Sequence, residues 1–238
     1  MNKRPTYKRI LIKLSGEVMA GGRGVGIEPS ELRTLAEEIE ELRGLKVEVA
    51  LVTGGGNLIR GAQATAYDLE RVTADQLGML TTIINGLALR DVLEKRGVPT
   101  SIQSAVPVGD IAALYVRSHA LKDLRDGKVI IFVGGTGNPY FTTDTAASLR
   151  ALEIGAEIIL KATKVDGVYD SDPVKNPTAM KFDTISYQEV LQRRLRVMDA
   201  TAISLCMDHQ LPLVVFNSGV KGSMRRIIGG EKEGTLIH

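Results

Sequence analysis

A lysine, an arginine and an aspartate each stand beside a glycine-rich stretch of this 238-residue chain. Lys13 interrupts the apolar run RILIKL just before LSG, Arg60 follows GGGNLI, and Asp144 lies in TTDTAA after GGTGN. A lysine in a buried strand is unfavourable unless it is paired. Glycine-rich turns expose backbone N–H groups that bind anions, and nearby cations stabilise a phosphoryl group during its transfer. These residues therefore predict phosphate chemistry.

Two of these three side chains also have a purely structural interpretation. Arg60 could be a solvated surface arginine, and Asp144 could be a first-turn acid that is favoured by the helix dipole. After a phosphate-binding turn, Asp144 could instead orient a lysine or help to hold Mg²⁺. The chain contains neither GxxxxGK[ST] nor GxGxxG, and it lacks the catalytic-loop pattern of protein kinases.

The glycine-rich turns follow predicted strands. Strands are predicted at 9–14, 47–52, 100–105, 128–133, 157–162 and 211–216. Several of them are apolar at successive positions without alternation, which is typical of parallel strands buried on both faces. Helical patterns are predicted around 32–42 and at about 75–96, 143–155 and 200–210. We expect one domain, residues 1–238, with a three-layer α/β/α fold and a mainly parallel open sheet. The turns then meet at the carboxyl edge of the sheet, where ligands bind.

The predicted helix at 75–96 carries more apolar residues than one amphipathic stripe requires, from Leu77 to Leu93. A single-domain core could bury the additional residues. A helix-mediated subunit interface explains them equally well and predicts a homo-oligomer.

Composition restricts the ligand and the compartment. A formal net charge of +2 argues against nucleic acid or an anionic membrane as a partner. The single cysteine, Cys206, fits a reducing compartment, and three histidines with one cysteine offer no zinc-site spacing. No apolar stretch approaches the roughly 20 residues that span a bilayer, and Lys13 breaks the short N-terminal apolar run, unlike a signal peptide. We expect a cytoplasmic protein.

Five stretches together closely resemble the bacterial uridylate kinases of the amino acid kinase superfamily: KRILIKLSGE, VTGGGNLIRG, GTGNPYFTTDTAA, LKATKVDGVYDSDP and GEKEGTLI. The similarity runs from Tyr7 to Ile237. It implies the carbamate kinase-like fold and reversible transfer of the γ-phosphoryl group of MgATP to UMP, which gives UDP and ADP for pyrimidine nucleotide biosynthesis. The Mg²⁺ would be carried with ATP, without a metal site on the protein. The resemblance also implies a cytoplasmic homohexamer, a trimer of dimers.

Matched by position, the resemblance implies a role for individual residues. Lys13 and Arg60 would stabilise the transferring phosphoryl group, with Asp144 organising them. In the C-terminal lobe and the first turns, ATP would be bound by Lys13, Leu14, Ser15, Gly16, Gly56, Arg60, Thr163, Tyr169 and Asp172. In the N-terminal lobe, UMP would be bound by Gly55, Asp75 (through the ribose hydroxyls), Thr136, Gly137, Asn138, Pro139, Tyr140, Phe141, Thr142 and Thr143. On spacing alone, Tyr169 could be ordinary packing, and Asp172 before Pro173 could be a turn residue.

Many members of this family are activated by GTP and inhibited by UTP. The segment linked to GTP activation is matched here by Gly21, Gly22, Arg23, Gly24, Val25 and Gly26. Its glycine content is equally typical of a plain mobile loop. Where some members carry more basic residues near the expected effector pocket, this chain has Glu94 and Ser101.

Two other functions remain open from the sequence. The same fold could phosphorylate an amino acid or carbamate to an acylphosphate. Alternatively, the chain could sense UMP or UTP without turnover, although a pure sensor has no need of the charged set Lys13, Arg60 and Asp144.

Overall fold

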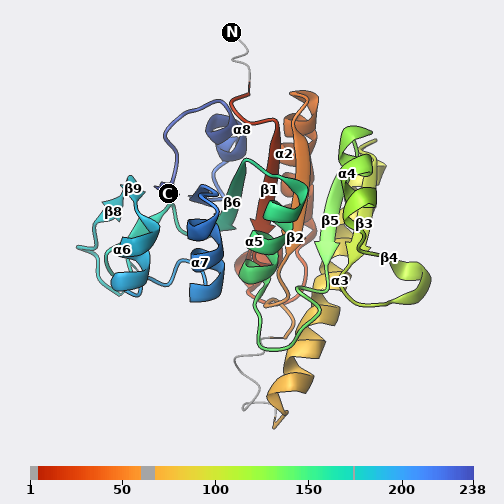
Figure 1. Ribbon diagram of the computed structural model, residues 1–238, viewed down its shortest axis with the longest axis horizontal. Coiled ribbons are helices and arrows are strands. Elements are labelled where there is room, and N and C mark those ends of the chain that lie inside the picture. Colours follow the sequence, from red (N-terminus) through yellow and green to blue (C-terminus); the bar gives the residue numbers. More distant parts are fainter. Residues whose placement is uncertain (1–4, 60–67, 174) are drawn as a thin grey trace.

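The computed structural model describes residues 5–59, 68–173 and 175–238. Within these ranges, one nine-stranded sheet runs through the molecule in the order β4-β3-β5-β2-β1-β6-β10-β11-β9 (Figure 1). Its strands are parallel except that β11 pairs antiparallel with β10. Their bounds are β1 Arg9–Leu14, β2 Glu48–Thr53, β3 Thr100–Ser104, β4 Ala113–Leu114, β5 Val129–Val133, β6 Ile158–Thr163, β9 Thr184–Ile185, β10 Leu213–Asn217 and β11 Thr235–Ile237. A separate antiparallel pair joins β7 (Val168–Tyr169) to β8 (Lys181–Phe182).

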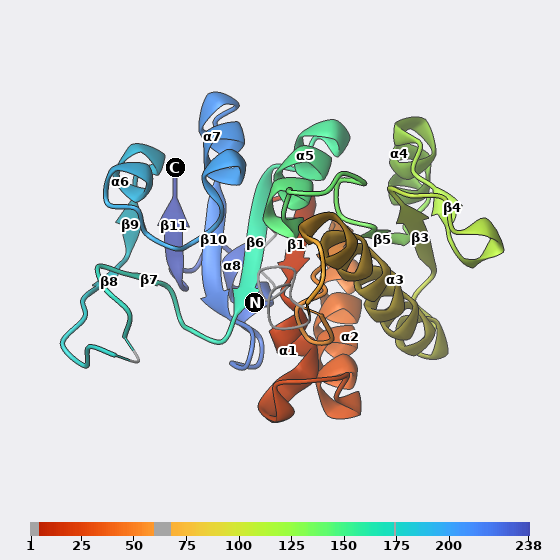
Figure 2. The ribbon, with the colours of Figure 1, turned by 90° about the horizontal axis from the view of Figure 1, so that it is seen from below.

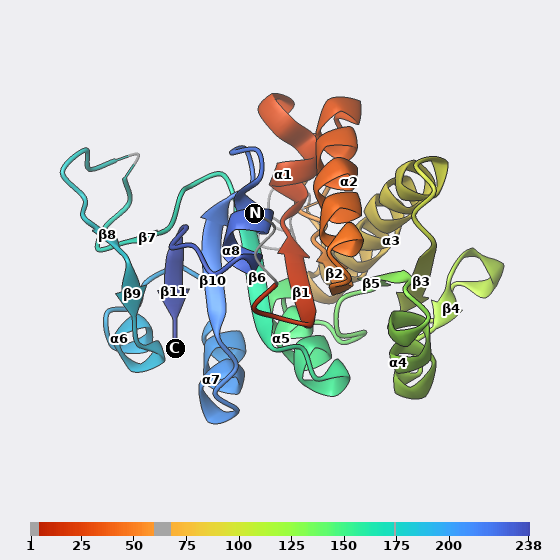
Figure 3. The ribbon, with the colours of Figure 1, turned by 90° about the horizontal axis from the view of Figure 1, so that it is seen from above.

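Helices cover both faces of the sheet (Figures 2 and 3). One face packs against α1 (Gly16–Ala20), α2 (Pro29–Gly44), α3 (Arg71–Lys95) and α8 (Ser223–Ile228). The other packs against α4 (Arg117–Arg125), α5 (Thr143–Ile154), α6 (Tyr187–Gln192) and α7 (Ala200–Asp208). The chain also forms two short 3-10 helices, η1 (Gly21–Arg23) and η3 (Gly109–Ile111). In this part of the chain, no helix combines the length and the apolarity needed to cross a membrane.

Strand β1 lies near the middle of the sheet and contributes to both cores. Ile10, Ile12 and Leu14 are fully buried on the α2 and α3 face, and Leu11 is fully buried on the α5 face. Burial of each such side chain is worth about 1.5–3 kcal/mol. Successive side chains of a strand point to opposite faces, so Lys13 shares the face of Leu11. The alternation therefore directs this lysine toward α5.

Local signals fix where α5 begins and ends. The side chain of Thr142 caps the helix by accepting hydrogen bonds from the backbone N–H groups of Asp144 and Thr145, at 3.0 and 3.4 Å. Gly155 ends the helix in the left-handed conformation, with φ of 67°, which glycine adopts without steric cost. The cap places Asp144 in the first turn, at the carboxyl edge of the sheet.

The predicted three-layer fold with a mainly parallel sheet is confirmed. All six predicted strands are present, each with ends within two residues of the prediction, and the middle helix begins at Arg71, four residues earlier than expected. The short strands β4, β7, β8, β9 and β11 were not predicted from the sequence. The division of the domain into an acceptor lobe and a donor lobe stays a prediction.

Candidate active site

The turns after β1, β2 and β5 meet at one edge of the sheet and enclose a cavity of about 380 Å³. Helix α3 and the loop from β5 to α5 both contribute lining residues, and Figure 1 shows this loop below the sheet. The lining residues are Lys13, Ser15, Gly16, Glu17, Gly54, Gly55, Gly56, Ile59, Arg71, Ala74, Asp75, Gly78, Met79, Thr82, Gly135, Thr136, Phe141, Thr142 and Thr143. Glycine backbone, hydroxyls and the start of α5 are the groups that bind anionic phosphates.

Two glycines permit a close approach of the first two turns. A Cβ atom on Gly16 would lie 2.6 Å from the backbone nitrogen of Asn57, and one on Gly55 would lie 2.6 Å from the carbonyl oxygen of Gly78. Neither neighbouring atom is at the end of a flexible side chain, so a larger residue would displace the turns. Glycine is required at both positions because the turns pack directly on each other and on α3.

A buried pair of amides holds the second turn. Asn57 and Asn85 are 1% and 0% exposed and exchange two hydrogen bonds, of 3.0 and 2.7 Å. Asn85 also donates to the carbonyl of Gly54, and Asn57 donates to that of Gly26, each at 2.7 Å. Buried polar groups are costly when unpaired, so this network fixes the turn and joins it to the glycine-rich segment 21–26.

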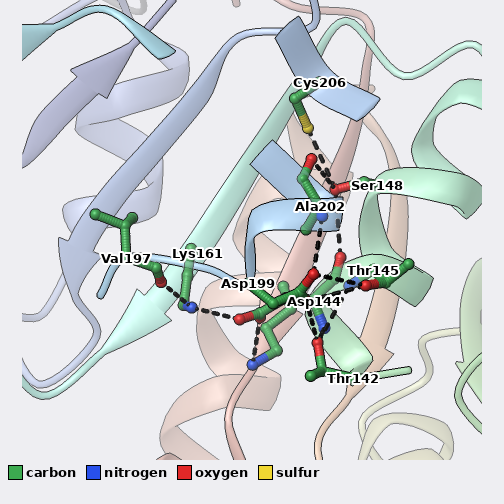
Figure 4. A network of polar contacts seen from close by, with 10 residues as sticks. Thr142, Asp144, Thr145, Ser148, Lys161, Val197, Asp199, Ala202 and Cys206 are labelled. Atoms are coloured by element: carbon green, nitrogen blue, oxygen red, sulfur yellow. Dashed lines mark hydrogen bonds and ion pairs between the residues drawn. The ribbon is translucent and has the colours of Figure 1, made fainter. Parts of the chain in front are cut away.

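Lys13 and Lys161 share the carboxylate of Asp144 at the floor of the site, and Figure 4 shows Lys161 beside this carboxylate. The Nζ atom of Lys13 lies 2.8 Å from Oδ1 of Asp144, and that of Lys161 lies 2.8 Å from Oδ2. The two lysines are 7% and 9% exposed and lie opposite each other in the pairing of β1 with β6. Asp144 therefore acts as the organiser of two cations, which supports the lysine-orienting interpretation of its sequence position.

The charges of this cluster alter its protonation equilibria. Burial alone would raise the pKa of Asp144, but the positive charges of Lys13 and Lys161 outweigh burial and lower it to about 2. Burial lowers the pKa of Lys161, and the charge of Asp144 partly offsets that effect. Asp144 is therefore an anion at neutral pH, with both oxygens engaged, and is not available as a general base.

A second aspartate, Asp199, ties α5 to α7 beside this cluster (Figure 4). It caps α7 by accepting a hydrogen bond from the N–H of Ala202 at 2.9 Å. It also accepts hydrogen bonds from the hydroxyls of Thr142 and Thr145. Lys161 donates to the carbonyl of Val197, two residues before Asp199. The first turn of α5 is thus held from both sides.

The side of the cavity formed by α3 contains Asp75 and lies against the loop 134–142. Asp75 accepts hydrogen bonds from Nε of Arg71 at 3.0 and 2.8 Å, and from the backbone N–H of Tyr140 at 2.8 Å. Of the predicted loop residues, Thr136, Phe141, Thr142 and Thr143 line the cavity. Asn138 bonds instead to Thr136, and the N–H of Gly137 donates to the carbonyl of Gly134.

A second cavity, of about 280 Å³, opens beside the turns after β6 and β10. Its lining residues are Val18, Gly21, Gly22, Glu31, Thr163, Lys164, Asn217, Ser218 and Gly219. Nζ of Lys164 donates to the carbonyl of Gly21 at 2.8 Å. This cavity therefore brings the predicted Thr163 to the same edge of the sheet as Lys13.

The structure places the predicted site residues in different positions relative to the two cavities. Lys13, Ser15, Gly16, Gly55, Gly56, Asp75 and Thr163 line the two cavities, and Asp144 holds the lysines below them. Leu14 is fully buried in the core, so only its backbone lies at the site. Tyr169 and Asp172 line neither cavity; the hydroxyl of Tyr169 donates to Asp166 at 2.6 Å, and Asp172 is exposed. Arg60 lies outside the described residues.

Three residues of the site, Lys161, Asp199 and Arg71, were not predicted from the sequence. Lys161 carries the same signal as Lys13, since it interrupts the apolar strand IILKAT, where it is the fourth of six residues. No local signal marks Asp199, whose partners Thr142 and Thr145 lie more than 50 residues away in the chain.

Metal ligands are sparse at this edge. Among the described residues, no three histidine, cysteine, aspartate or glutamate side chains come together as a metal site. Both oxygens of Asp144 contact lysine.

Comparison with known proteins extends over nearly the whole chain. The profile of the amino acid kinase family matches residues 8–217. A uridylate kinase of Alcanivorax borkumensis is 52% identical over 235 residues, which cover 99% of this chain and 93% of that relative. The crystal structure of a UMP kinase from Bacillus anthracis superposes with a TM-score of 0.94 at 41% identity, covering 98% of this chain and 96% of the other. A UMP kinase from Ureaplasma parvum gives 0.90 at 39% identity, covering 97% and 98%. These matches confirm the predicted fold and the resemblance that the five motifs carry.

Proposed function

The chain belongs to the amino acid kinase family, and on that premise we propose that it transfers the γ-phosphoryl group of ATP to UMP, which gives UDP and ADP. The relatives named uridylate kinase and UMP kinase support this acceptor. The carrying observation is the buried cluster of Lys13, Asp144 and Lys161 beneath a cavity lined by three glycine-rich turns.

The two cavities suit two nucleotides. UMP would occupy the larger one, with its ribose at Asp75 and its phosphate near Gly55 and the start of α5. ATP would occupy the smaller one beside Thr163 and reach Lys13 with its phosphates, through the turn that contains Ser15 and Gly16. The γ-phosphoryl group would then lie between the cavities, over the lysine cluster.

The chemistry requires positioning and positive charge more than proton transfer. The second pKa of a phosphate monoester is about 6, so UMP carries an ionised attacking oxygen at neutral pH and needs no base. Lys13 would stabilise the negative charge on the transferring group. Asp144 keeps Lys13 extended toward the cavity, and Lys161 keeps Asp144 ionised. Mg²⁺, brought with ATP, would neutralise further phosphate charge.

An ADP-release assay with MgATP tests this function. The acceptors are UMP, CMP, dUMP, GMP, glutamate and carbamate, each with and without GTP or UTP. We expect turnover with UMP and none with glutamate or carbamate. Lys13→Ala should lose most turnover while keeping its melting temperature within a few degrees. The absence of ADP release with UMP under every condition, or unchanged turnover of Lys13→Ala, would contradict the proposal.

We also propose a homo-oligomer, a hexamer by resemblance, whose interface includes α3. Leu80 and Ile84 lie one turn apart on this helix and are 50% and 49% exposed. Burial of such side chains between subunits would remove apolar surface from water.

Regulation by GTP and UTP is a further part of the proposal, supported by the contacts of segment 21–26. Gly26 exchanges hydrogen bonds with Asn57 in the acceptor turn, and Gly21 accepts one from Lys164 in the donor cavity. A ligand on this segment would therefore act on both substrate cavities. We assign the activity to pyrimidine nucleotide synthesis in the cytoplasm, where a single unbridged cysteine is typical.

A further inference from the structure

Asp75 joins two parts of the acceptor cavity that are distant in sequence. Its Oδ1 and Oδ2 atoms accept hydrogen bonds from Nε of Arg71, one helical turn earlier on α3. Its Oδ2 also accepts the backbone N–H of Tyr140, 65 residues later. The side chain of Asp75 is only 12% exposed, whereas that of Arg71 is 47% exposed. The carboxylate is thus held from one side by a cation and from the other by the acceptor loop.

Asp75 binds the loop 134–142 at Tyr140, where the backbone has an uncommon conformation. Tyr140 has φ of 71°, in the left-handed region that residues other than glycine seldom adopt. Tyr140 is 66% exposed, and its ring lies under the guanidinium of Arg71, whose Cζ is 5.4 Å from the ring centroid. Asp75 bonds the Tyr140 backbone and Arg71 stacks on its ring. The same two residues therefore hold the loop by two independent contacts.

The contacts of Asp75 leave room for a ligand. A carboxylate offers about four acceptor positions, and contacts with the described residues use three of them, two on Oδ2 and one on Oδ1. Both Arg71 and Asp75 line the cavity. A sugar hydroxyl could therefore donate to Oδ1 without displacing Arg71 or the loop.

Electrostatics explains why a cation is needed beside this carboxylate. A nucleoside monophosphate is close to a dianion at neutral pH, and Glu17 adds a second acidic side chain to the cavity wall. An aspartate without a partner would repel such a ligand, and repulsion is strong where solvent is partly excluded. The positive charge of Arg71 offsets the negative charge of Asp75. The carboxylate of Asp75 can still accept a hydrogen bond from the ligand.

We propose that Arg71 is a positioning residue that makes Asp75 selective for the ribose of the acceptor. It fixes the carboxylate, offsets its charge and, through Tyr140, keeps the acceptor loop over the cavity. This inference rests on the proposed function, because it assigns the larger cavity to the acceptor nucleotide. It concerns the acceptor alone: Arg71 does not line the donor cavity beside Thr163.

Arg71→Gln tests the inference, with Arg71→Lys and Asp75→Asn as companions. We expect Arg71→Gln to raise KM for UMP about tenfold or more, with KM for ATP changed less than twofold. The preference for UMP over dUMP should fall at least fivefold. A misplaced Asp75 carboxylate loses more hydrogen bonding with UMP, which has both ribose hydroxyls, than with dUMP. Arg71→Lys should recover part of the affinity, because it restores the charge but not the planar guanidinium whose Nε contacts both carboxylate oxygens. Calorimetric titration of UMP without ATP should show the same order of affinities.

The double variant separates positioning from direct contact. If Arg71 acts through Asp75, Arg71→Gln should add little to the selectivity loss of Asp75→Asn. Arg96→Gln is the matched control, since Arg96 caps the other end of α3 and pairs with Glu37 and Glu40 on α2. Its KM values should stay those of the wild type.

Several outcomes would overturn the inference. They are equal losses for UMP and dUMP, full additivity in the double variant, or unchanged UMP binding by folded Arg71→Gln. Failure of the proposed function has a different signature, the absence of ADP release by the wild type with UMP. In that case, the role of Arg71 is tested by the calorimetric titrations alone, which compare UMP binding by the wild type and by Arg71→Gln.

Discussion

Lys13 and Lys161 lie directly opposite each other on β1 and β6, and each contacts a different oxygen of Asp144. Two buried like charges would repel strongly without the carboxylate between them. The arrangement carries a net positive charge at the edge of the larger cavity. In the proposed reaction, an incoming phosphoryl group would supply the missing anion.

Lys161→Met should lower kcat for UMP phosphorylation by about a hundredfold, a loss typical of removing one preorganised charge near a transition state. Without Lys161, Asp144 is free to rotate and Lys13 loses its fixed position. The KM values should change much less than kcat in steady-state kinetics. Lys122→Met is the control, because Lys122 forms an exposed pair with Asp126, and it should behave as the wild type. A folded Lys161→Met enzyme with full kcat would refute the role.

Acid should destabilise the fold through Asp144. Its pKa is lowered to about 2 in the folded chain, from an ordinary value of 3.8. The ionised form therefore contributes stability above pH 4, and this contribution of about 2 kcal/mol is lost as the pH falls toward 2. Urea unfolding between pH 2 and 5 should show this slope. Asp144→Asn should show a shallower slope and lower stability at pH 7, since it leaves two buried lysines uncompensated. Asp91→Asn, in an exposed pair with Lys95, should keep the wild-type slope.

Gly16→Ala should damage both the site and the fold. Its Cβ would lie 2.6 Å from the backbone of Asn57 and 2.7 Å from that of Gly56. Overpacking of this kind costs about 1–3 kcal/mol, and the displaced turn should reduce kcat/KM for UMP. Gly44→Ala, at the end of α2 with no atom within 4 Å of the new Cβ, should retain activity. Denaturant unfolding and steady-state kinetics of both variants provide the test; equal behaviour would show that the turns have room.

Leu80→Glu together with Ile84→Glu should dissociate the proposed oligomer. Charges on two half-exposed positions of α3 would oppose burial between subunits. Light scattering after gel filtration measures the change in mass. Met180→Glu is the control, because Met180 is 70% exposed next to β8 and away from α3. An unchanged mass for the α3 variant would move the interface elsewhere.

Most of the main strands could be predicted because they are short runs rich in isoleucine, valine and leucine. Each of them is buried on both faces, and this burial leaves a direct pattern in the sequence. The strand β11 has only three residues and follows EKEG, so its pairing with β10 depends on tertiary contacts. The same holds for β7, β8 and β9, which have two residues each.

The site was predictable where a residue breaks its local pattern. Lys13 does so in β1, and Lys161 does so in β6 in the same way, although only the first was recognised. Asp199 and Arg71 do not break any pattern: one caps a helix and the other begins one, as polar residues commonly do. Their roles follow from partners that only the folded chain brings near.

The central position of β1 in the sheet affects the order in which the strands can pair during synthesis. Its neighbours are β2, which ends at Thr53, and β6, which begins at Ile158. While the chain leaves the ribosome, β1 can pair with β2 early, but its other edge stays open through the synthesis of the next hundred residues. Lys13 meets Asp144 and Lys161 only when that edge closes. The first strand synthesised is thus among the last to be completed, and a chain truncated before β6 has no assembled lysine cluster.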